Sequence, residues 1–499
     1  MPRFKDADNS QNMILPVNLQ NQLIEGTFEH ASCLVIDKID LSGLEKKYNN
    51  DLKGAAAYPP AALLKIILNA YAKGVISSRG IEQLCRENIT FMAISGDLRP
   101  DHSTIADFIA CLEKEILKIF QEVLLICAQC DLIGGEAFAL DGCKLPSAAA
   151  KEWSGTFKEL AKKKESLVGT LKYLMARHKE ADQKQDKQRL SNSRDRIINK
   201  IDKITKYLRT NEPKPGTRGR EVKSNITDNG SAKMHSPHGV IQGYNGLALA
   251  DRKHQVVVQA DTFGNVSECG YLPEVLEQAV VNLRQSKRRN FSLGGKLVLA
   301  DTNYFSEANC KYLSEHKIDG YIPDAGFRKR DPRYPHKKEE SRKKNKYRQE
   351  DFTYHKTGDY YICPQGKKLT LENRNLSYHG YRGARYLAKA KDCGACVKQH
   401  KCLQANSKRR NLFIIKEKKN QTYSAKMRNK IDTSAGRDIY AARMGIVEPV
   451  FANIAYHKKM NRFNYRGRSK VRIQWILYNL VHNFGKIAKY GNLDRFKNN

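Results

Sequence analysis

Two short apolar stretches decide the fold class, Ala137-Phe138-Ala139-Leu140-Asp141 and Lys296-Leu297-Val298-Leu299-Ala300-Asp301. Each has the length of a buried strand, and each ends in an aspartate. Between them, residues 243–251 and 255–261 are apolar segments separated by a short turn, which predicts a β-hairpin. Residues 272–283 then have the spacing of a helix. Strands, a hairpin and alternating helices together predict a mixed α/β sheet.

The chain before this sheet has helical patterns. Pro59 and Pro60 open an apolar segment that stops at Gly74, and proline at the start with glycine past the end is typical of a helix. Further helices are expected after Ser77 and after Pro100. Short helices joined by tight turns fit a DNA-binding helix-turn-helix, and they fit a plain helical bundle equally well.

Residues 156–209 form an insertion of different character. Leucine and isoleucine recur at spacings of three, four and seven, and lysine and arginine fill most other positions. This pattern predicts a basic helical hairpin with a narrow apolar seam. A dimer contact, an arm along DNA and a solvated extension all fit it.

The remaining chain divides by composition. Residues 326–350 are rich in lysine and arginine and are expected to be a loop, followed by a strand-rich segment with cysteines to about residue 412. Helices are expected at 434–458 and 469–487. We therefore expect an N-terminal helical domain, the first part of the sheet domain, a basic loop with a cysteine-containing insertion, and the C-terminal part of the sheet domain, at residues 1–130, 131–325, 326–430 and 431–499.

The charge of the chain points to a polyanionic partner. Its 499 residues include 88 Lys and Arg against 53 Asp and Glu, a formal net charge of +35. Such a charge disfavours a compact fold unless a polyanion binds, and nucleic acid is the expected one inside a cell. There is no apolar run long enough for a membrane span and no secretory signal, so we expect a cytoplasmic protein without a membrane partner.

Three carboxylates stand out as candidates for metal chemistry. Asp141 and Asp301 end their strands, where a sheet displays functional side chains. Glu448 lies beside a predicted buried stripe and is followed by Pro449, which a helix interior normally avoids. The stripe consists of Tyr440, Met444, Val447, Phe451 and Ile454. Convergent carboxylates normally hold a hard cation such as Mg²⁺, although a turn aspartate or a surface ion-pair network also fits each residue alone.

These acids lie in motifs that resemble those of bacterial insertion-sequence transposases of the DDE class. The C-terminal signature is Tyr440-x-x-Arg443, Val447-Glu448-Pro449-Val450-Phe451 and Arg462-Phe463-x-x-Arg466-Gly467. The strands of the first two acids are similar in Leu140-Asp141-Gly142-x-Lys144 and Ala300-Asp301-x-x-Tyr304-Phe305-Ser306. Further similar stretches are Tyr58-Pro59-Pro60-x-x-Leu63-Leu64-Lys65, Arg99-Pro100-Asp101-His102-Ser103-Thr104-Ile105 and Gln242-Gly243-Tyr244-Asn245. They follow the family order over nearly the whole chain.

The resemblance implies an RNase H-like mixed sheet with helices on both faces, behind a helical DNA-binding domain. It implies that Asp141, Asp301 and Glu448 are catalytic and hold Mg²⁺ or Mn²⁺ in a two-metal mechanism. The partners would be the terminal inverted repeats of the element and target DNA, bound by a homodimer in the bacterial nucleoid. The side chains expected to contact DNA are Lys144, Tyr440, Arg443, Lys458, Lys459, Arg462 and Arg466.

One position departs from the family pattern. A lysine usually stands seven residues after the glutamate, and this chain has Ala455 there, so we expect Lys458 or Lys459 to supply the phosphate contact. Asp251 and Asp261 are alternatives to Asp301, which the family match favours. A catalytically decayed or domesticated DNA-binding protein and a stand-alone RNase H-like nuclease are the alternatives to a transposase.

Four of the twelve cysteines form a motif of their own. Cys393-x-x-Cys396 is followed by Cys402 and preceded by Cys363, and four thiolates suit a structural zinc site. His400 is an alternative ligand. A reduced, metal-free cluster that packs a small β insertion fits the same pattern. The other cysteines fit apolar patterns and are expected in the core.

Overall fold

The computed structural model describes residues 16–48, 56–180, 184–216, 220–236, 239–286, 290–334, 347–378, 381–404, 407–418 and 422–496. The chain forms two compact units. Unit 1 consists of residues 1–296 and 443–499, and unit 2 consists of residues 297–442. Both helices and strands are present in each, so the predicted mixed α/β class is confirmed.

An antiparallel sheet forms the centre of unit 1. Strand β7 (Gly239–Asp251) pairs with β1 (Ala137–Pro146), β6 (Ala232–Ser236) and β8 (Val257–Phe263). The predicted hairpin between β7 and β8 is confirmed. Two details were wrong: β1 continues past Asp141 because β7 is long enough to pair with it up to Pro146, and β8 continues past Asp261 to Phe263.

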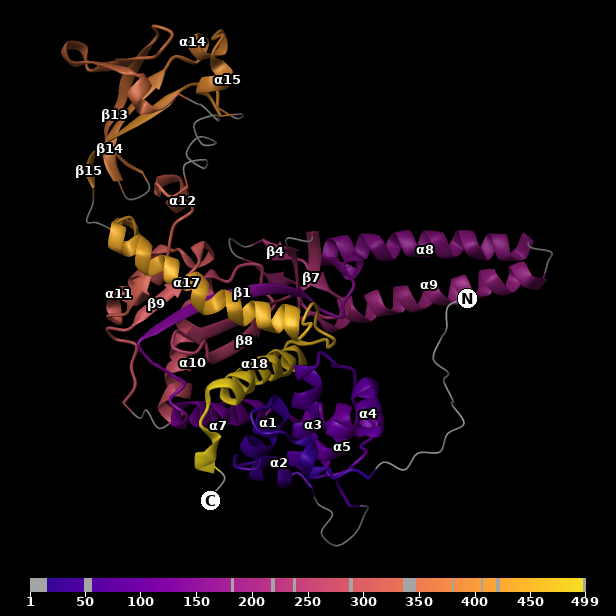
Figure 1. Ribbon diagram of the computed structural model, residues 1–499. Coiled ribbons are helices and arrows are strands. Elements are labelled where there is room, and N and C mark those ends of the chain that lie inside the picture. Colours follow the sequence, from indigo (N-terminus) through magenta and orange to yellow (C-terminus); the bar gives the residue numbers. More distant parts are fainter. Residues whose placement is uncertain are drawn as a thin grey trace, which may run out of the picture. The chain divides into compact units, whose positions relative to one another are not determined.

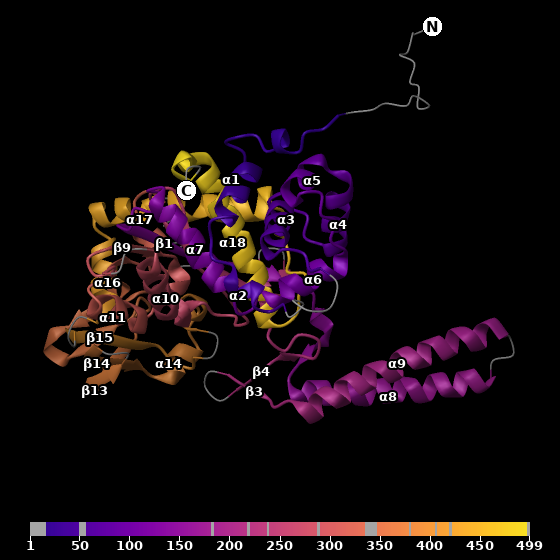
Figure 2. The same ribbon diagram turned by 90° about the horizontal axis from the view of Figure 1, so that it is seen from below.

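Helices cover this sheet and build the N-terminal region. They are α1 (Phe28–Ile36), α2 (Ser42–Glu45), α3 (Pro60–Ala72), α4 (Ser78–Glu87), α5 (Ile89–Ser95), α6 (His102–Cys111), α7 (Ile116–Gln129), α10 (Leu272–Gln285) and α18 (Arg468–Tyr490). Single 3₁₀ turns lie at Gln20–Gln22, Cys269–Tyr271 and Leu493–Phe496. Helix α18 runs among α1, α3 and α7 (Figure 2). Ring contacts between Tyr71 and Tyr478, 5.1 Å between centroids, and between Phe28 and Phe484 join these helices into one core.

The motif Arg99–Ile105 contains the start of helix α6. The Asp101 side chain caps α6 by accepting the backbone N–H groups of Ser103 and Thr104 at 2.8 and 2.9 Å. His102 contacts Glu82 of α4 through Nδ1 at 2.9 Å. The motif therefore fixes the angle between two helices of the N-terminal region.

The basic insertion is a helical hairpin, as predicted. Helices α8 (Phe157–Glu180) and α9 (Lys184–Thr210) run side by side away from the sheet (Figure 1). Their buried residues, Leu160, Ile204 and Tyr207, cluster at the base. Around the base lie a 3₁₀ turn (Lys151–Trp153) and two short ladders, β2 (Ser154–Gly155) with β5 (Ser224–Asn225) and β3 (Lys214–Pro215) with β4 (Glu221–Val222).

Unit 2 contains strands of two different sheets. Parallel strands β9 (Leu297–Ala300) and β10 (Asp319–Tyr321) are accompanied by a 3₁₀ turn (Thr302–Tyr304), α11 (Glu307–Glu315), α12 (Phe327–Arg330) and α16 (Tyr423–Ile431). The second sheet has the order β11 (Thr353–His355), β12 (Tyr360–Ile362), β13 (Lys368–Tyr378), β14 (Tyr381–Ala388) and β15 (Asn411–Lys418). Two 3₁₀ turns (Gln349–Asp351, Lys356–Gly358) and helices α14 (Ala390–Gly394) and α15 (Gln399–Cys402) complete it.

The basic loop differs in part from its prediction. Residues 327–330 form α12, because Arg330 binds Asp324 and Asp432 and Phe327 is buried. Residues 335–346 of this loop lie outside the described residues.

Helix α17 (Ser434–Ala452) carries the C-terminal signature and contains Pro449. It continues into a π-helical turn at Asn453–His457. The predicted buried stripe was wrong in part: Met444 is 55% exposed, and the buried face consists of Arg443, Ile446, Val447, Val450 and Ile454. Apolar residues occur on more than one side of this helix, so their spacing alone did not select the packed side.

No helix in the described part of the chain is long and apolar enough to cross a membrane.

Candidate active site

An ion pair within unit 1 connects the first-aspartate strand with the signature helix. Nη2 of Arg443 lies 2.6 Å from Oδ2 of Asp141, and the other carboxylate oxygen accepts the backbone N–H of Gly142 at 2.9 Å. Arg443 is 9% exposed, and the Asp141 side chain is 21% exposed. A charge with so little solvent is stable only when it is paired, so each residue holds the other in position.

Gly142 is required by close packing beside Asp141. A Cβ at this position would lie 2.5 Å from Cδ2 of Leu247 and 2.7 Å from Oε2 of Glu268. Glu268 is 4% exposed and was not among the sequence-based candidates, because nothing in its loop distinguishes it from a surface acid. Burial raises the pKa of the neighbouring Cys143 thiol, and the nearby carboxylates of Asp141 and Glu268 raise it further. Cys143 therefore stays protonated and offers no thiolate here.

Glu448 lies on the exposed side of α17. Pro449 lacks the N–H that would bond to the Gly445 carbonyl four residues earlier. The side chain of Gln255 donates to that carbonyl at 3.3 Å, so the helix continues through the proline with its backbone satisfied. The pair Glu448-Pro449 is thus accommodated by a partner from the turn between β7 and β8.

Asp301 and Tyr440 belong to unit 2. Asp301 directly follows β9, as predicted, and accepts the backbone N–H of Asn303 at 3.0 Å as the cap of a 3₁₀ turn. Tyr440 contacts Phe327 edge-on, with 5.4 Å between ring centroids. The convergence of Asp301 with Asp141 and Glu448 stays a prediction. Among the described residues, no three His, Cys, Asp or Glu side chains are arranged to hold one metal ion.

The two alternative aspartates have structural surroundings. Asp251, 1% exposed, accepts N–H groups from Gly134, Gly135 and Lys253 and so closes the turn after β7. Asp261 lies in β8, and its carboxylate is 3.0 Å from Arg472. Burial raises the pKa of Asp261, although Arg472 opposes that shift.

The basic side chains expected at DNA are distributed over unit 1. Lys144 is half-buried on β1, and alternation along the strand places it on the face opposite to Asp141. Nζ of Lys458 lies 5.5 Å from the centre of the Phe28 ring, and burial lowers its pKa. Lys459 has a positive φ of 56° and packs its stem against Gly74. Arg462 is exposed, as is Arg466, whose Nε donates to the Ala148 carbonyl at 3.1 Å.

Comparisons with known proteins identify the family from both ends of the chain. Residues 18–111 match the family described as Transposase domain (DUF772), and residues 362–488 match the family described as Transposase DDE domain. Both matches support an insertion-sequence transposase of the DDE class. The second match includes Arg443, Glu448 and the four clustered cysteines, whereas Asp141 and Asp301 lie before it. A search of curated proteins finds no match. As a transposase, the protein acts on DNA and cleaves and transfers its strands.

Proposed function

We propose that this transposase cuts DNA at the ends of its own element and joins those ends to target DNA, with Asp141, Asp301 and Glu448 as ligands of divalent cations. The observation that carries the proposal is the 2.6 Å pair between Arg443 and Asp141. It brings the helix of the Tyr-x-x-Arg and Glu-Pro motifs to the strand of the first aspartate within one unit.

The donor chemistry suits hard cations, because all three side chains are carboxylates and none of the described thiols or imidazoles joins them. Bound Mg²⁺ or Mn²⁺ would polarise the phosphodiester and the attacking oxygen. Arg443 acts as a positioning residue that fixes one oxygen of Asp141 through its guanidinium. The zinc predicted from the cysteines takes no part in this chemistry, since closed thiolate sites leave no position for substrate.

Two phosphoryl transfers complete the reaction. First, a water oxygen bonds to phosphorus at the element end and the P–O3′ bond breaks, which leaves a free 3′-hydroxyl and a 5′-phosphate. That hydroxyl then bonds to a target phosphorus and displaces the target 3′-oxygen. In each transfer the attacking oxygen gives a proton to solvent, and the leaving 3′-oxygen takes a proton from solvent. Two element ends must be held together for this, so we propose a homodimer on the terminal inverted repeats.

Lysine and arginine side chains of unit 1 would bind the DNA backbone. Arg462 and Arg466 are exposed beside the signature helix, and phosphate contacts from such residues position DNA without reading its sequence. Ala455 is exposed in the π-helical turn, where the family usually has a lysine, and Lys459 is the exposed cation that follows it. We propose Lys459 for that contact.

Cleavage of a DNA fragment carrying the flanks of the gene tests the proposal. Wild-type protein with Mg²⁺ should cut at a defined position, and Asp141→Asn, Asp301→Asn and Glu448→Gln should each abolish cutting while DNA binding persists. The matched control is Asp438→Asn, an exposed acid of the same helix α17, which should cut as wild type does. Cutting by Glu448→Gln would remove Glu448 from the site. Binding without cutting by wild type, in Mg²⁺ and in Mn²⁺, would favour a decayed transposase.

A further inference from the structure

The small sheet β11–β15 has a core too small to account for its order. Its buried residues number six, Phe352, Leu369, Ala384, Tyr386, Ala388 and Leu412. Modules with little apolar burial usually need a disulfide or a metal ion. All four cysteines of this segment are free thiols, and three of them, Cys363, Cys393 and Cys402, pack against this core.

The turn after β12 presents Cys363 in the manner of a metal knuckle. The backbone N–H of Lys367 donates to Sγ of Cys363 at 3.3 Å, while the Cys363 N–H donates to the Lys367 carbonyl at 2.9 Å. Gly366, with a φ of +71°, allows the chain to reverse there. An N–H that points at sulfur favours thiolate over thiol, because the donor stabilises negative charge.

Cys393 lies near the end of α14, and Cys396 follows that helix. The Cys396 N–H donates to the Cys393 carbonyl at 3.3 Å, and the Arg410 backbone N–H donates to Sγ of Cys393 at 3.4 Å. The Arg410 guanidinium then bonds to the carbonyls of Cys402 and Tyr347 at 2.9 and 2.8 Å. Arg410 thereby ties together three segments of the cluster.

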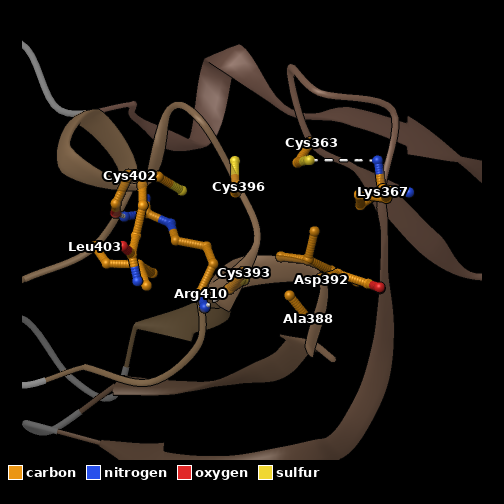
Figure 3. Close-up of a pocket in the computed structure, with 11 residues that line it drawn as sticks. Cys363, Lys367, Ala388, Asp392, Cys393, Cys396, Cys402, Leu403 and Arg410 are labelled. Carbon is orange, nitrogen blue, oxygen red and sulfur yellow. Dashed lines mark hydrogen bonds between the residues drawn. The ribbon is translucent and has the colours of Figure 1, made fainter. Parts of the chain in front are cut away.

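The four cysteines line one cavity of about 30 Å³, shown in Figure 3. They come from three places in the chain: the β12–β13 turn, α14 with the residues after it, and the end of α15. His400 is exposed and does not line this cavity, so the alternative histidine ligand has no support. A metal-free apolar cluster would not need N–H groups aimed at two of its sulfur atoms.

We propose that Cys363, Cys393, Cys396 and Cys402 bind one structural zinc ion that holds the β11–β15 sheet together. The four thiols line the cavity, but their sulfur atoms are not arranged to hold one ion as they stand. Rotation about each Cα–Cβ bond moves a sulfur between staggered positions, so binding requires such a rearrangement of the side chains. Four thiolates around Zn²⁺ carry two negative charges. Lys367 and Arg410 supply two positive charges at the cavity, and Asp392, which also lines it, removes one.

Metal analysis of the full-length protein tests this site. Protein purified from zinc-supplemented cells should contain about one zinc ion per chain, and Cys363→Ser and Cys396→Ser should each contain on the order of tenfold less. The matched control is Cys111→Ser, an exposed cysteine of α6, which should keep the full amount. Glu448→Gln should also keep it, which separates this site from the proposed active site.

A measurement on unmutated protein covers the case in which the serine variants do not fold. Cobalt in place of zinc should give the absorption of a tetrahedral ion with thiolate-to-metal charge transfer, and a mercurial reagent should release the ion as four thiols react. Absence of zinc from the wild-type protein overturns the proposal. Zinc that survives both serine substitutions, or cobalt without thiolate absorption, overturns it as well.

Discussion

Helix α18 and the hairpin of α8 and α9 are long helical segments with opposite surroundings. In α18, 14 of 23 residues are buried, including the polar residues Gln474, His482 and Asn483. Asn483 binds both backbone groups of Val257 in β8 at 2.8 Å, so this polar side chain replaces a strand partner. Among its described residues, the hairpin buries side chains only at its base, and Tyr173 farther along is 59% exposed.

The difference shows that the spacing of apolar residues does not indicate whether a helix is buried in a core. Both segments repeat apolar residues at three and four, yet one packs in the core of unit 1 and the other extends from it. His482 and Asn483 are buried with hydrogen-bond partners for both polar atoms of each side chain, which marks α18 as structural. The exposed surface of the basic hairpin beyond its base still fits a dimer contact, an arm along DNA or a solvated extension.

The largest effect is expected from Trp475→Ala in α18. Trp475 is fully buried, contacts the rings of Phe451 and Phe463, and donates its Nε1–H to the Leu247 carbonyl at 2.8 Å. Removing it leaves a cavity beside Gly246 and an unpaired carbonyl, which should lower the free energy of unfolding by about 3–5 kcal/mol. Denaturant unfolding followed by circular dichroism measures this.

The hairpin supplies the control for that substitution. Tyr173→Ala removes an exposed aromatic residue and should change the free energy of unfolding by less than about 0.5 kcal/mol. Equal losses for the two variants would mean that the hairpin is packed as tightly as α18.

A smaller effect is expected from acid, through His482 of α18. Its pKa is lowered from 6.5 to about 3, mainly by burial and to a smaller extent by the charges of Lys486 and Lys458, while the hydrogen bond to the Gln255 carbonyl opposes the shift. The Gln255 carbonyl must accept from Nε2, at 2.8 Å, which leaves the neutral Nδ1 to accept from the Asn453 amide at 2.9 Å. Protonation of Nδ1 would place its N–H opposite the N–H of the Asn453 amide, and this hydrogen bond would be lost.

The unfolded state binds this proton more tightly than the folded state does. The contribution of neutral His482 to the free energy of unfolding is therefore fully present above pH 6.5 and is lost as the pH falls toward 3. The loss from this group should be about 2 kcal/mol between pH 6.5 and about pH 5. Unfolding midpoints across this range measure it. His482→Gln should flatten the decline, whereas His178→Gln in the hairpin should follow the wild-type curve. If the stability of His482→Gln fell with pH as steeply as that of the wild type, the fall would be due to other groups.

Local signals in the sequence predicted most elements of the fold. Proline and glycine mark the ends of α3, and the lysine-rich apolar repeat marks the hairpin. The end of β1 was missed because Gly142, Cys143 and Lys144 are not an apolar run, and only pairing with β7 extends the strand. The packed face of α17 was missed because it depends on which neighbours the helix meets.

The candidate site was predictable only as a set of residue types. Carboxylates at the ends of apolar segments led to Asp141 and Asp301, and the helical stripe led to Glu448. The family motifs then included all three. The pairing of Arg443 with Asp141 and the contact of Gln255 with the Gly445 carbonyl join segments far apart in the chain. No local pattern encodes such contacts, since each residue alone resembles an ordinary surface cation or amide.

A small effect on stability, and the sharpest contrast with α18, is expected from shortening the hairpin. Replacing residues 164–203 by a short glycine-serine linker keeps the core at the base, formed by Leu160, Ile204 and Tyr207. The free energy of unfolding of the rest should change by less than about 1 kcal/mol, because loop closure costs little. If the hairpin lies along DNA, the shortened protein should bind DNA more weakly and with a shallower dependence on salt, since fewer counterions are released. Unchanged DNA binding together with a loss of dimers in sedimentation would instead make the hairpin the contact between two subunits.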